Sequence, residues 1–342
     1  MITLVKDGKK LSRWSRAEVS SNIDNCLKSY SFSTDRAVDI KAGDKCSVLV
    51  DGKEHARLII EKVRKKAESN KTSYEGRDTA SVLVDSNVPD EAKRVPPGAE
   101  LVTIINKLIT ALQADITVNN NAGKIKPFRA TEIIQAEAGE NCFEFIEKYA
   151  RKRGVYYTAG IDSIDIYRLG QAVKTEFSFS NSNTIDQQVF VDISGRYSKY
   201  KVKSQAEVGA GYDNKKVSRE GTAEDKLIIP GRYREIVSDE SMTAAECKER
   251  AVEEANIKRA RSLNIKLKVD RHTVNDVIIQ PGKLAKVRTD IGVNGVFLIS
   301  SVRLRSDDMR GDTADITLTY PDAYSVVEKM NNKQKKRTDI DV

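Results

Sequence analysis

The fold is decided by the stretch Tyr74-Glu75-Gly76-Arg77-Asp78-Thr79-Ala80-Ser81-Val82-Leu83-Val84-Asp85-Ser86-Asn87-Val88. It is typical of a strand that leads into a short helical turn over 79–84, in which the apolar residues are buried. Gly76 permits a positive φ or a close backbone approach, and we expect Asp78 to cap the turn by accepting hydrogen bonds from its first free N–H groups. No nucleophile, base or phosphate-binding loop is visible here, so the residues alone indicate a structural role.

Other short motifs occur along the chain in a fixed order. They are Lys6-Asp7-Gly8-Lys9, Trp14, the polar strand Ala17 to Asp24, Ser31-Phe32-Ser33, Phe143 to Tyr157, Pro281-Gly282-Lys283, Phe297-Leu298-Ile299 and Gly311 to Leu318. With these, Gly76-Arg77-Asp78 and Leu83-Val84-Asp85-Ser86 resemble the signature of baseplate hub proteins from contractile phage tails. That group includes the phage Mu hub and the late-control D family, and is related to type VI secretion spike proteins. Ser86 stands where a cysteine is common in the family.

The resemblance implies a mainly β fold with two small tail-tube-like β-barrels, an inserted α+β domain and a bridging helix. It implies a structural subunit that forms a homotrimeric ring, joins the sixfold tail tube to the threefold central spike and allows DNA to pass. The partners would be two further copies of the chain, tail tube and spike proteins, and baseplate wedge proteins. The location would be the virion tail baseplate, assembled in the cytoplasm of a bacterial host. Gly76, Arg77, Asp78, Leu83 and Asp85 would be the structural residues of the motif.

The residue pattern indicates how the chain divides, and 342 residues suffice for two or three domains. We expect a first β-barrel over 1–90 (completed by 171–205), an inserted α+β domain over 91–170, a second β-barrel domain over 206–327 with a long helix at 243–262, and a disordered basic tail over 328–342.

Local signals mark individual hairpins and helices. Asp7-Gly8 and Asp51-Gly52 stand between apolar runs and predict tight hairpin turns. Apolar residues from Leu101 to Leu112 recur at helical spacing, and Asn141 is placed to cap a helix that ends near Gly154. The apolar face of this second helix consists of Phe145, Ile146, Tyr149 and Ala150. Thr243 and Glu246 form a capping box for the long helix. Its apolar face consists of alanines and one cysteine, which favours close packing on a sheet of this chain or on a neighbouring copy.

Lysine and arginine (58) exceed aspartate and glutamate (50), which gives a formal charge of +8. The excess favours an acidic partner, either nucleic acid or an acidic protein face. The alternating lysines indicate either a solvated or protected strand edge, or a wall that faces nucleic acid. If the chain forms a channel, the candidates to line it are Lys199, Lys201, Lys203, Lys266 and Lys268.

A rival hypothesis is a nucleic-acid-binding protein with a helix-turn-helix. Its first helix would cover 131–137 and its second 142–153, with Arg151, Lys152 and Arg153 on phosphates. The tyrosine-rich hairpin that follows favours a packed α+β unit instead.

Signals for catalysis are missing from the sequence. There is no P-loop and no Gly-x-Ser-x-Gly elbow. No sequence pattern indicates the pair of carboxylates beside a sugar-binding cleft that a lysozyme-like site needs. His55 and His272 lie far apart without a Cys or His neighbour, so we interpret each as a surface or core residue. The scattered Cys26, Cys46, Cys142 and Cys247 indicate buried free thiols. We therefore expect no enzyme, cofactor or metal site. The sequence contains no run of about 18 apolar residues, so it predicts no membrane anchor. The N-terminus is too short and too quickly polar for a signal peptide.

Overall fold

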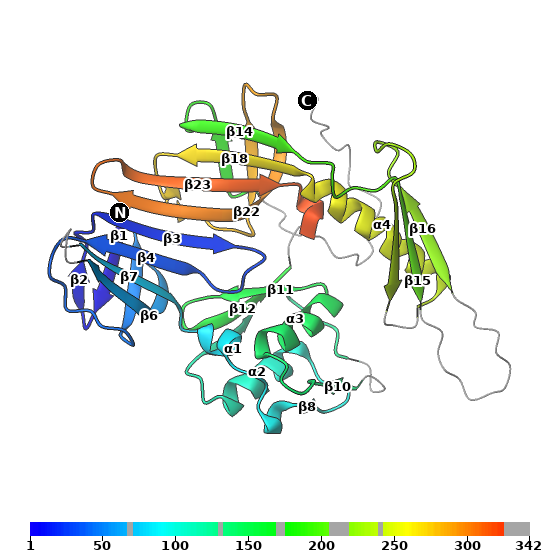
Figure 1. Cartoon of the computed structure of the whole chain (residues 1–342), viewed down its shortest axis with the longest axis horizontal. Helices are drawn as coiled ribbons and strands as arrows, with labels where there is room; N and C mark the ends of the chain where they lie inside the picture. The colour runs from blue at the N-terminus through cyan, green and yellow to red at the C-terminus, as the bar shows by residue number, and fades with distance from the viewer. Residues whose placement is uncertain (67–70, 129–132, 169–174, 205–218, 239–241, 325–342) are drawn as a thin grey trace. The chain divides into compact units, whose positions relative to one another are not determined.

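Strands dominate the computed structural model, which describes residues 1–66, 71–128, 133–168, 175–204, 219–238 and 242–324 (Figure 1). The mainly β fold with a small helical insertion is confirmed. The chain separates into two compact units. The first consists of Met1–Gln187 and Lys266–Leu318, and the second of Gln188–Ile265 and Thr319–Val342.

The large sheet of the first unit is built from segments at both ends of the chain. Its strands are β1 (Ile2–Lys6), β2 (Lys9–Leu11), β3 (Arg16–Asn22), β4 (Ser29–Thr34), β5 (Lys45–Val50), β6 (Lys53–Lys66), β7 (Lys71–Asp78), β13 (Phe177–Ser180), β18 (Leu263–Val269), β21 (Leu284–Arg288), β22 (Asn294–Asp307) and β23 (Gly311–Thr319). They run in the order β18-β23-β22-β3-β4-β7-β6-β5-β1-β2, and β21 pairs with both β22 and β13. A small hairpin, β19–β20 (Thr273–Val274 and Val277–Ile278), lies between β18 and β21 in the sequence.

The sheet is continuous because β3 pairs with β22 in antiparallel register, from Arg16 opposite Asp307 to Asn22 opposite Ser301. Within β4 to β7 the buried residues alternate with exposed or half-buried ones, as the two-residue period of a strand requires. The inward positions of β7 are Tyr74, Gly76 and Asp78. Tyr74 therefore places an aromatic ring in the core and Asp78 a carboxylate, whereas Gly76 adds no side chain there.

Both predicted tight turns are confirmed. Asp7-Gly8 joins β1 to β2 and Asp51-Gly52 joins β5 to β6, with positive φ angles at all four residues. Positive φ is tolerated by glycine and, less well, by aspartate. Asp51, in the second of these turns, also belongs to a polar network around the amino group of Met1.

The α+β region between the strands has a core of its own. It contains α1 (Ser81–Asp85), a 3₁₀ turn (Asp90–Ala92), β8 (Arg94–Val95), α2 (Leu101–Ala111), β9 (Thr117–Asn120), β10 (Ile134–Gln135), α3 (Cys142–Lys152), β11 (Tyr156–Ala159) and β12 (Ser163–Tyr167). The apolar faces predicted for both longer helices are buried. The Asn141 side chain accepts a hydrogen bond from Phe143 N, which confirms the predicted cap of α3.

The second unit contains a three-stranded sheet covered by the long helix. Strand β15 (Lys199–Ser204) lies between β16 (Glu220–Glu224) and β17 (Tyr233–Ser238), and β14 (Asp186–Val191) precedes them. Helix α4 (Ala244–Arg261) begins with the predicted capping box of Thr243 and Glu246. The core is small: Tyr200, Val202, Cys247 and Ala251.

The approach of α4 to the sheet is so close that only glycine fits beneath it. A β-carbon on Gly221 would lie 2.1 Å from Lys248 N and 2.4 Å from the carbonyl carbon of Cys247. The alanine face thus packs on a sheet of the same chain, which was one of the two expected partners. A further 3₁₀ turn (Pro321–Tyr324) also contacts the helix.

Several expectations stay predictions. The closure of either β region into a barrel and the boundaries at 1–90, 91–170 and 206–327 are among them. The predicted disordered tail, 328–342, lies outside the described residues. All four cysteines are free and buried, as expected. No helix in the described part of the chain is both long and apolar enough to cross a bilayer.

Candidate functional site

Gly76 lies at a contact between strands that excludes any side chain. A β-carbon there would lie 2.4 Å from the carbonyl oxygen of Ile59 and 2.9 Å from a methyl carbon of Leu58. The register between β6 and β7 also shifts here, between Ile60 and Lys62. Glycine is required because the backbones approach closely at an irregular point of the ladder.

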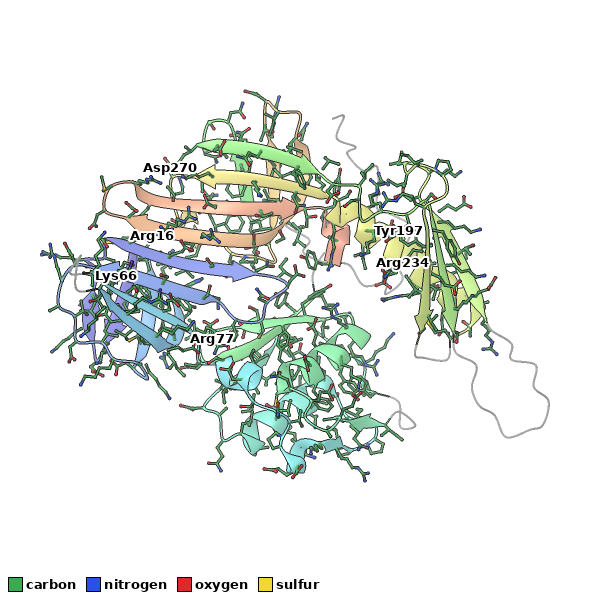
Figure 2. The ribbon with its side chains drawn as sticks, in the orientation of Figure 1. Arg16, Lys66, Arg77, Tyr197, Arg234 and Asp270 are labelled. Carbon is green, nitrogen blue, oxygen red and sulfur yellow. The ribbon has the colours of Figure 1, made fainter. Side chains whose placement is uncertain are left out.

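Arg77, which is labelled in Figure 2, binds two carboxylates at once. Its guanidinium donates to Glu61 with the shortest contact at 2.6 Å, and to both carboxylate oxygens of Asp85 at 3.1 and 2.6 Å. These hydrogen bonds raise the pKa of Arg77, and they tie strand β6 and helix α1 to β7. Leu83, a residue of the same helix, is buried. The motif side chains therefore hold elements together.

Asp78 does not cap the turn that follows it, so that prediction is wrong. Helix α1 has no side-chain cap. Asp78 points inward because β7 continues through it, and it is completely buried. It accepts hydrogen bonds from Tyr30 Oη and Lys28 N, both at 2.6 Å, and the Lys28 ammonium lies 3.8 Å away.

Burial raises the pKa of Asp78, although Lys28 and the hydroxyl of Tyr30 act in the opposite direction. The Lys28 ammonium also donates to the carbonyl of Ala159 in the α+β region. This buried group of Asp78, Tyr30 and Lys28 joins β4, β7 and β11. It is closed to solvent, so it is a structural group.

The lysines proposed to line a channel lie in both units. Lys199, Lys201 and Lys203 alternate along β15, and since β15 is the central strand of its sheet, they do not protect an edge. Lys201 pairs with Glu220 at 2.5 Å and Lys203 with Glu235 at 2.8 Å. Their charges are therefore partly neutralised within the sheet.

Lys266 and Lys268 lie on β18, where Lys266 is exposed and Lys268 half-buried. A small pocket beside Lys268 is lined by Arg16, Arg305, Asp307, Arg310 and Thr313 (Arg16 is labelled in Figure 2). Two of its arginines already donate to Glu18. The roles of all five lysines in a channel stay predictions.

The helix-turn-helix of the rival hypothesis, over 131–153, is not formed in the part of it that the structure describes, which begins at 133. Residues Ile134–Gln135 form strand β10, which pairs with β8, so the first helix does not exist where it was predicted. The second does exist as α3, but Arg151 pairs with Glu147 and Arg153 lies over the ring of Phe128. The β pairing prevails because 134–135 completes a ladder with Arg94–Val95.

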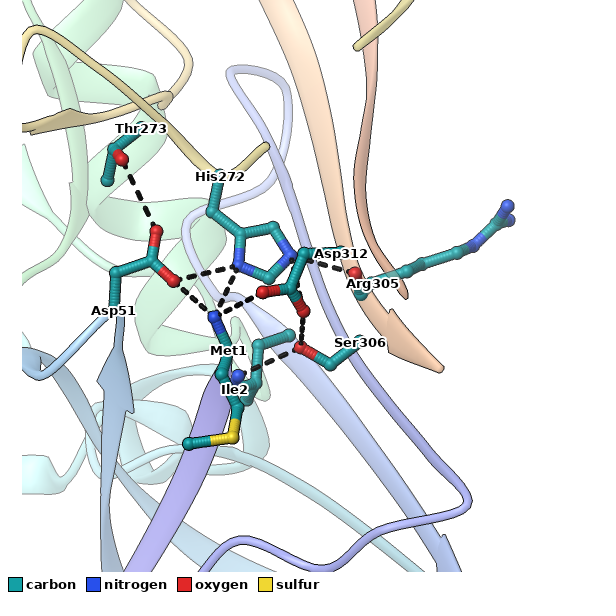
Figure 3. A network of polar contacts seen from close by, with 8 residues as sticks. All are labelled: Met1, Ile2, Asp51, His272, Thr273, Arg305, Ser306 and Asp312. Atoms are coloured by element: carbon teal, nitrogen blue, oxygen red, sulfur yellow. Dashed lines mark hydrogen bonds and ion pairs between the residues drawn. The ribbon is translucent and has the colours of Figure 1, made fainter. Parts of the chain in front are cut away.

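A polar network gathers around the amino group of Met1 (Figure 3). The ammonium donates to Asp51 and lies 2.6 Å from Asp312 Oδ2 and 3.5 Å from His272 Nδ1. His272 is completely buried, whereas the side chains of Asp51 and Asp312 are 29% and 35% exposed. The network is thus closed on the imidazole side and open to solvent on the other.

Neutral groups hold the outer atoms of this network. Ser306 Oγ donates to Asp312 Oδ1 at 2.6 Å and accepts from the backbone N–H of Ile2 at 2.9 Å. Thr273 Oγ1 donates to Asp51 Oδ2 at 3.3 Å. The Nε2 atom of the imidazole lies 2.7 Å from the carbonyl oxygen of Arg305.

The contacts within the network shift the pKa values of Asp312 and of the Met1 amino group. Burial alone would raise the pKa of Asp312, but hydrogen bonds from the amino group and Ser306, with the nearby imidazole, lower it below 3.8. Burial alone would lower the pKa of the Met1 amino group, but hydrogen bonds to both carboxylates raise it. Asp312 is therefore held in its charged form.

Sequence reasoning missed this network. His272 has no histidine or cysteine near it in sequence, and its partners come from residues 1, 51 and 312. Only the Asp51-Gly52 turn was recognisable, because its signal is local. The convergence depends on the pairing of distant strands, which no local pattern encodes.

Comparison with known proteins identifies the fold. No protein-family model matches the chain, and no curated protein matches it. Among solved structures, the 43 kDa tail protein of prophage MuSo2 from Shewanella oneidensis matches with a TM-score of 0.81 and 21% identity, over 95% of this chain and 99% of that one. A tail protein from Neisseria meningitidis matches with a TM-score of 0.79 and 21% identity, over 94% and 98%.

A more distant likeness extends to secretion machinery. A component of the type VI secretion system of E. coli, described as similar to the phage T4 tail proteins gp27 and gp5, matches with a TM-score of 0.55 and 12% identity, over 94% of this chain and 78% of that one. At these identities the comparisons show the fold. The chain has the fold of phage tail proteins, in agreement with the sequence resemblance.

Proposed function

We propose that this chain is a structural baseplate hub subunit of a contractile phage or phage-like tail. Three copies form a ring that joins the sixfold tail tube to the threefold central spike and leaves a passage for DNA. The further partners are baseplate wedge proteins, and the ring lies in the virion baseplate after assembly in the host cytoplasm. The protein acts through its surfaces and not as an enzyme.

One observation carries this proposal: the chain matches a prophage tail protein and a second tail protein over nearly the whole length of each pair of chains. An end-to-end match leaves little room for an additional catalytic domain in this chain. The likeness to a type VI secretion component described as similar to gp27 and gp5 supports a position near a spike.

The motif residues support a scaffold role as well. Gly76, Arg77 and Asp78 each serve to fix one element against another, and the buried Asp78 has no access to a substrate. A subunit of a symmetric ring needs a rigid shape and complementary surfaces. The helix-turn-helix hypothesis has lost its first helix, so the rival function has no specific observation in its favour.

The test is the oligomeric state of the purified full chain. Analytical ultracentrifugation should give the mass of three chains, and negative-stain images should show rings. A stable, monodisperse monomer at micromolar concentration, unchanged when spike protein is added, would contradict the proposal. Addition of spike protein is included because a ring subunit can require its neighbour to assemble.

A further inference from the structure

We propose that Asp51, His272 and Asp312 form a binding site for a divalent transition-metal ion of the zinc class. Each offers one ligand atom, and these atoms all lie within 4.8 Å of one another. They come from three distant places: the β5–β6 turn, the residue before β19, and the start of β23. Carboxylate oxygen and imidazole nitrogen together are a donor set that zinc accepts.

The ammonium alone does not neutralise the negative charge of the network. Two carboxylates face one ammonium, and the hydroxyls of Ser306 and Thr273 are neutral. Among the described residues no lysine or arginine forms an ion pair with Asp51 or Asp312. With a neutral imidazole the network keeps one excess negative charge, partly shielded from water. A divalent ion in place of the ammonium balances both carboxylates.

Neighbouring groups orient the three ligands through hydrogen bonds, as is common for metal ligands in proteins. Metal-binding histidines commonly donate their second ring nitrogen to a carbonyl, which fixes the ring and its tautomer. His272 Nε2 lies 2.7 Å from the Arg305 carbonyl, and in that tautomer Nδ1 keeps its lone pair on the side where Asp51 Oδ1 and the Met1 amino group lie, each 3.5 Å away. Asp312 lies 3.8 Å from Nε2 and reaches the same amino group through Oδ2 at 2.6 Å. Ser306 and Thr273 each donate to a carboxylate oxygen and so orient both acids.

The geometry requires a modest closure. A tetrahedral zinc ion with ligands at about 2.0–2.2 Å separates them by roughly 3.3 Å, so atoms that now lie within 4.8 Å of one another approach by up to about 1.5 Å. Asp51 lies on an exposed turn that can supply this movement. The ion takes the position between the carboxylates that the ammonium now holds, and the amino group moves toward solvent, where Met1 is already 65% exposed. Water completes the coordination.

The first test is zinc binding by isothermal titration calorimetry on the full chain, with the absorption spectrum of bound Co²⁺ as a second readout. The wild type should bind one equivalent and give the visible bands of a low-coordinate Co²⁺ site. Asp51→Asn and Asp312→Asn, which keep the side-chain shape, should each weaken binding by more than about tenfold. Asp44→Asn is the matched control, because Asp44 is an ion-paired carboxylate of the same unit, 2.7 Å from Lys6.

The orienting groups provide a second arm. Ser306→Ala removes the hydrogen bond to Asp312 and the acceptor of the Ile2 N–H but leaves all three ligands in place, so it should weaken zinc binding about 10- to 100-fold while one equivalent still binds. Circular dichroism without metal establishes that each variant is folded, and if an aspartate variant is not, Ser306→Ala and Thr273→Val decide the question. Absence of binding by the wild type, or equal loss in Asp44→Asn, would overturn the proposal and leave the ammonium as the cation of the network.

Discussion

Asp78 is the motif residue whose side chain would be most costly to remove. It is fully buried and accepts from Tyr30 and Lys28. Asp78→Ala leaves these donors and the Lys28 ammonium without their acceptor, so the free energy of unfolding should fall by about 3–5 kcal/mol. Tyr30→Phe removes one hydrogen bond and should cost about 1–3 kcal/mol. Urea denaturation monitored by circular dichroism measures both.

A surface carboxylate is the control for this comparison. Asp90 is paired only with Lys93 at the protein surface, and Asp90→Ala should leave the urea midpoint unchanged. If Asp78→Ala were as mild as Asp90→Ala, the buried group would not hold β4, β7 and β11 together. Equal losses in Asp78→Ala and Tyr30→Phe would also contradict this account.

Asp312 predicts how stability depends on acid. Its pKa in the folded protein lies below its ordinary value of 3.8, because hydrogen bonds from the amino group and Ser306 outweigh burial. Its contribution to stability is therefore fully present above about pH 4 and is lost as the pH falls through the lower folded pKa. The gap in unfolding free energy between wild type and Asp312→Asn should narrow as the pH falls from about 5 to 3. Parallel curves in that range would show that Asp312 is not linked to folding in this way.

The residues of the motif were found from sequence, but their roles were only partly predicted. The need for Gly76 to allow a close approach is confirmed, because a β-carbon would meet the Ile59 carbonyl. Asp78 was expected at a helix cap, since aspartate is a common cap. Its true role depends on Tyr30 and Lys28, which lie about fifty residues earlier, and local patterns cannot reveal such partners.

At the scale of elements, the packing of α4 on β16 depends on Gly221. A methyl group there would lie 2.1 Å from the backbone nitrogen of Lys248, so Gly221→Ala must push the helix off the sheet. We expect a loss of about 1–3 kcal/mol in the stability of the second unit, together with faster amide hydrogen exchange in α4.

Gly195 offers the matched control in the same unit. A β-carbon at Gly195 would meet no atom within 4 Å, so Gly195→Ala should leave stability unchanged or raise it slightly. Equal hydrogen exchange of α4 in both variants would contradict the close packing of helix and sheet.

Elements with strong local signals could be predicted, and those set by distant pairing could not. The Asp51-Gly52 hairpin, the α2 and α3 faces and the Thr243 capping box are all as expected. The strand at Ile134–Gln135 was not foreseen, and only the rival hypothesis assigned these residues, to a helix, because the β partner of the strand lies about forty residues earlier. The same reasoning explains why the pairing of β3 with β22 was not foreseen.

At the scale of the whole molecule, the structure shows two compact units and the fold of phage tail proteins. The division into two barrels and an insertion, and the ring built from three copies, are proposals that follow from the resemblance. The sequence led to this fold because several weak motifs occur in the order expected of one family, although no family model matches the chain. The polar network around His272 lay outside that resemblance and emerged only from the structure.

Cryo-electron microscopy of assembled tail particles that contain this chain tests the central proposal most directly. The account predicts three copies around the tail axis, at the level between the sixfold tube and the threefold spike. Six copies within the tube, or density for this chain away from that junction, would contradict it.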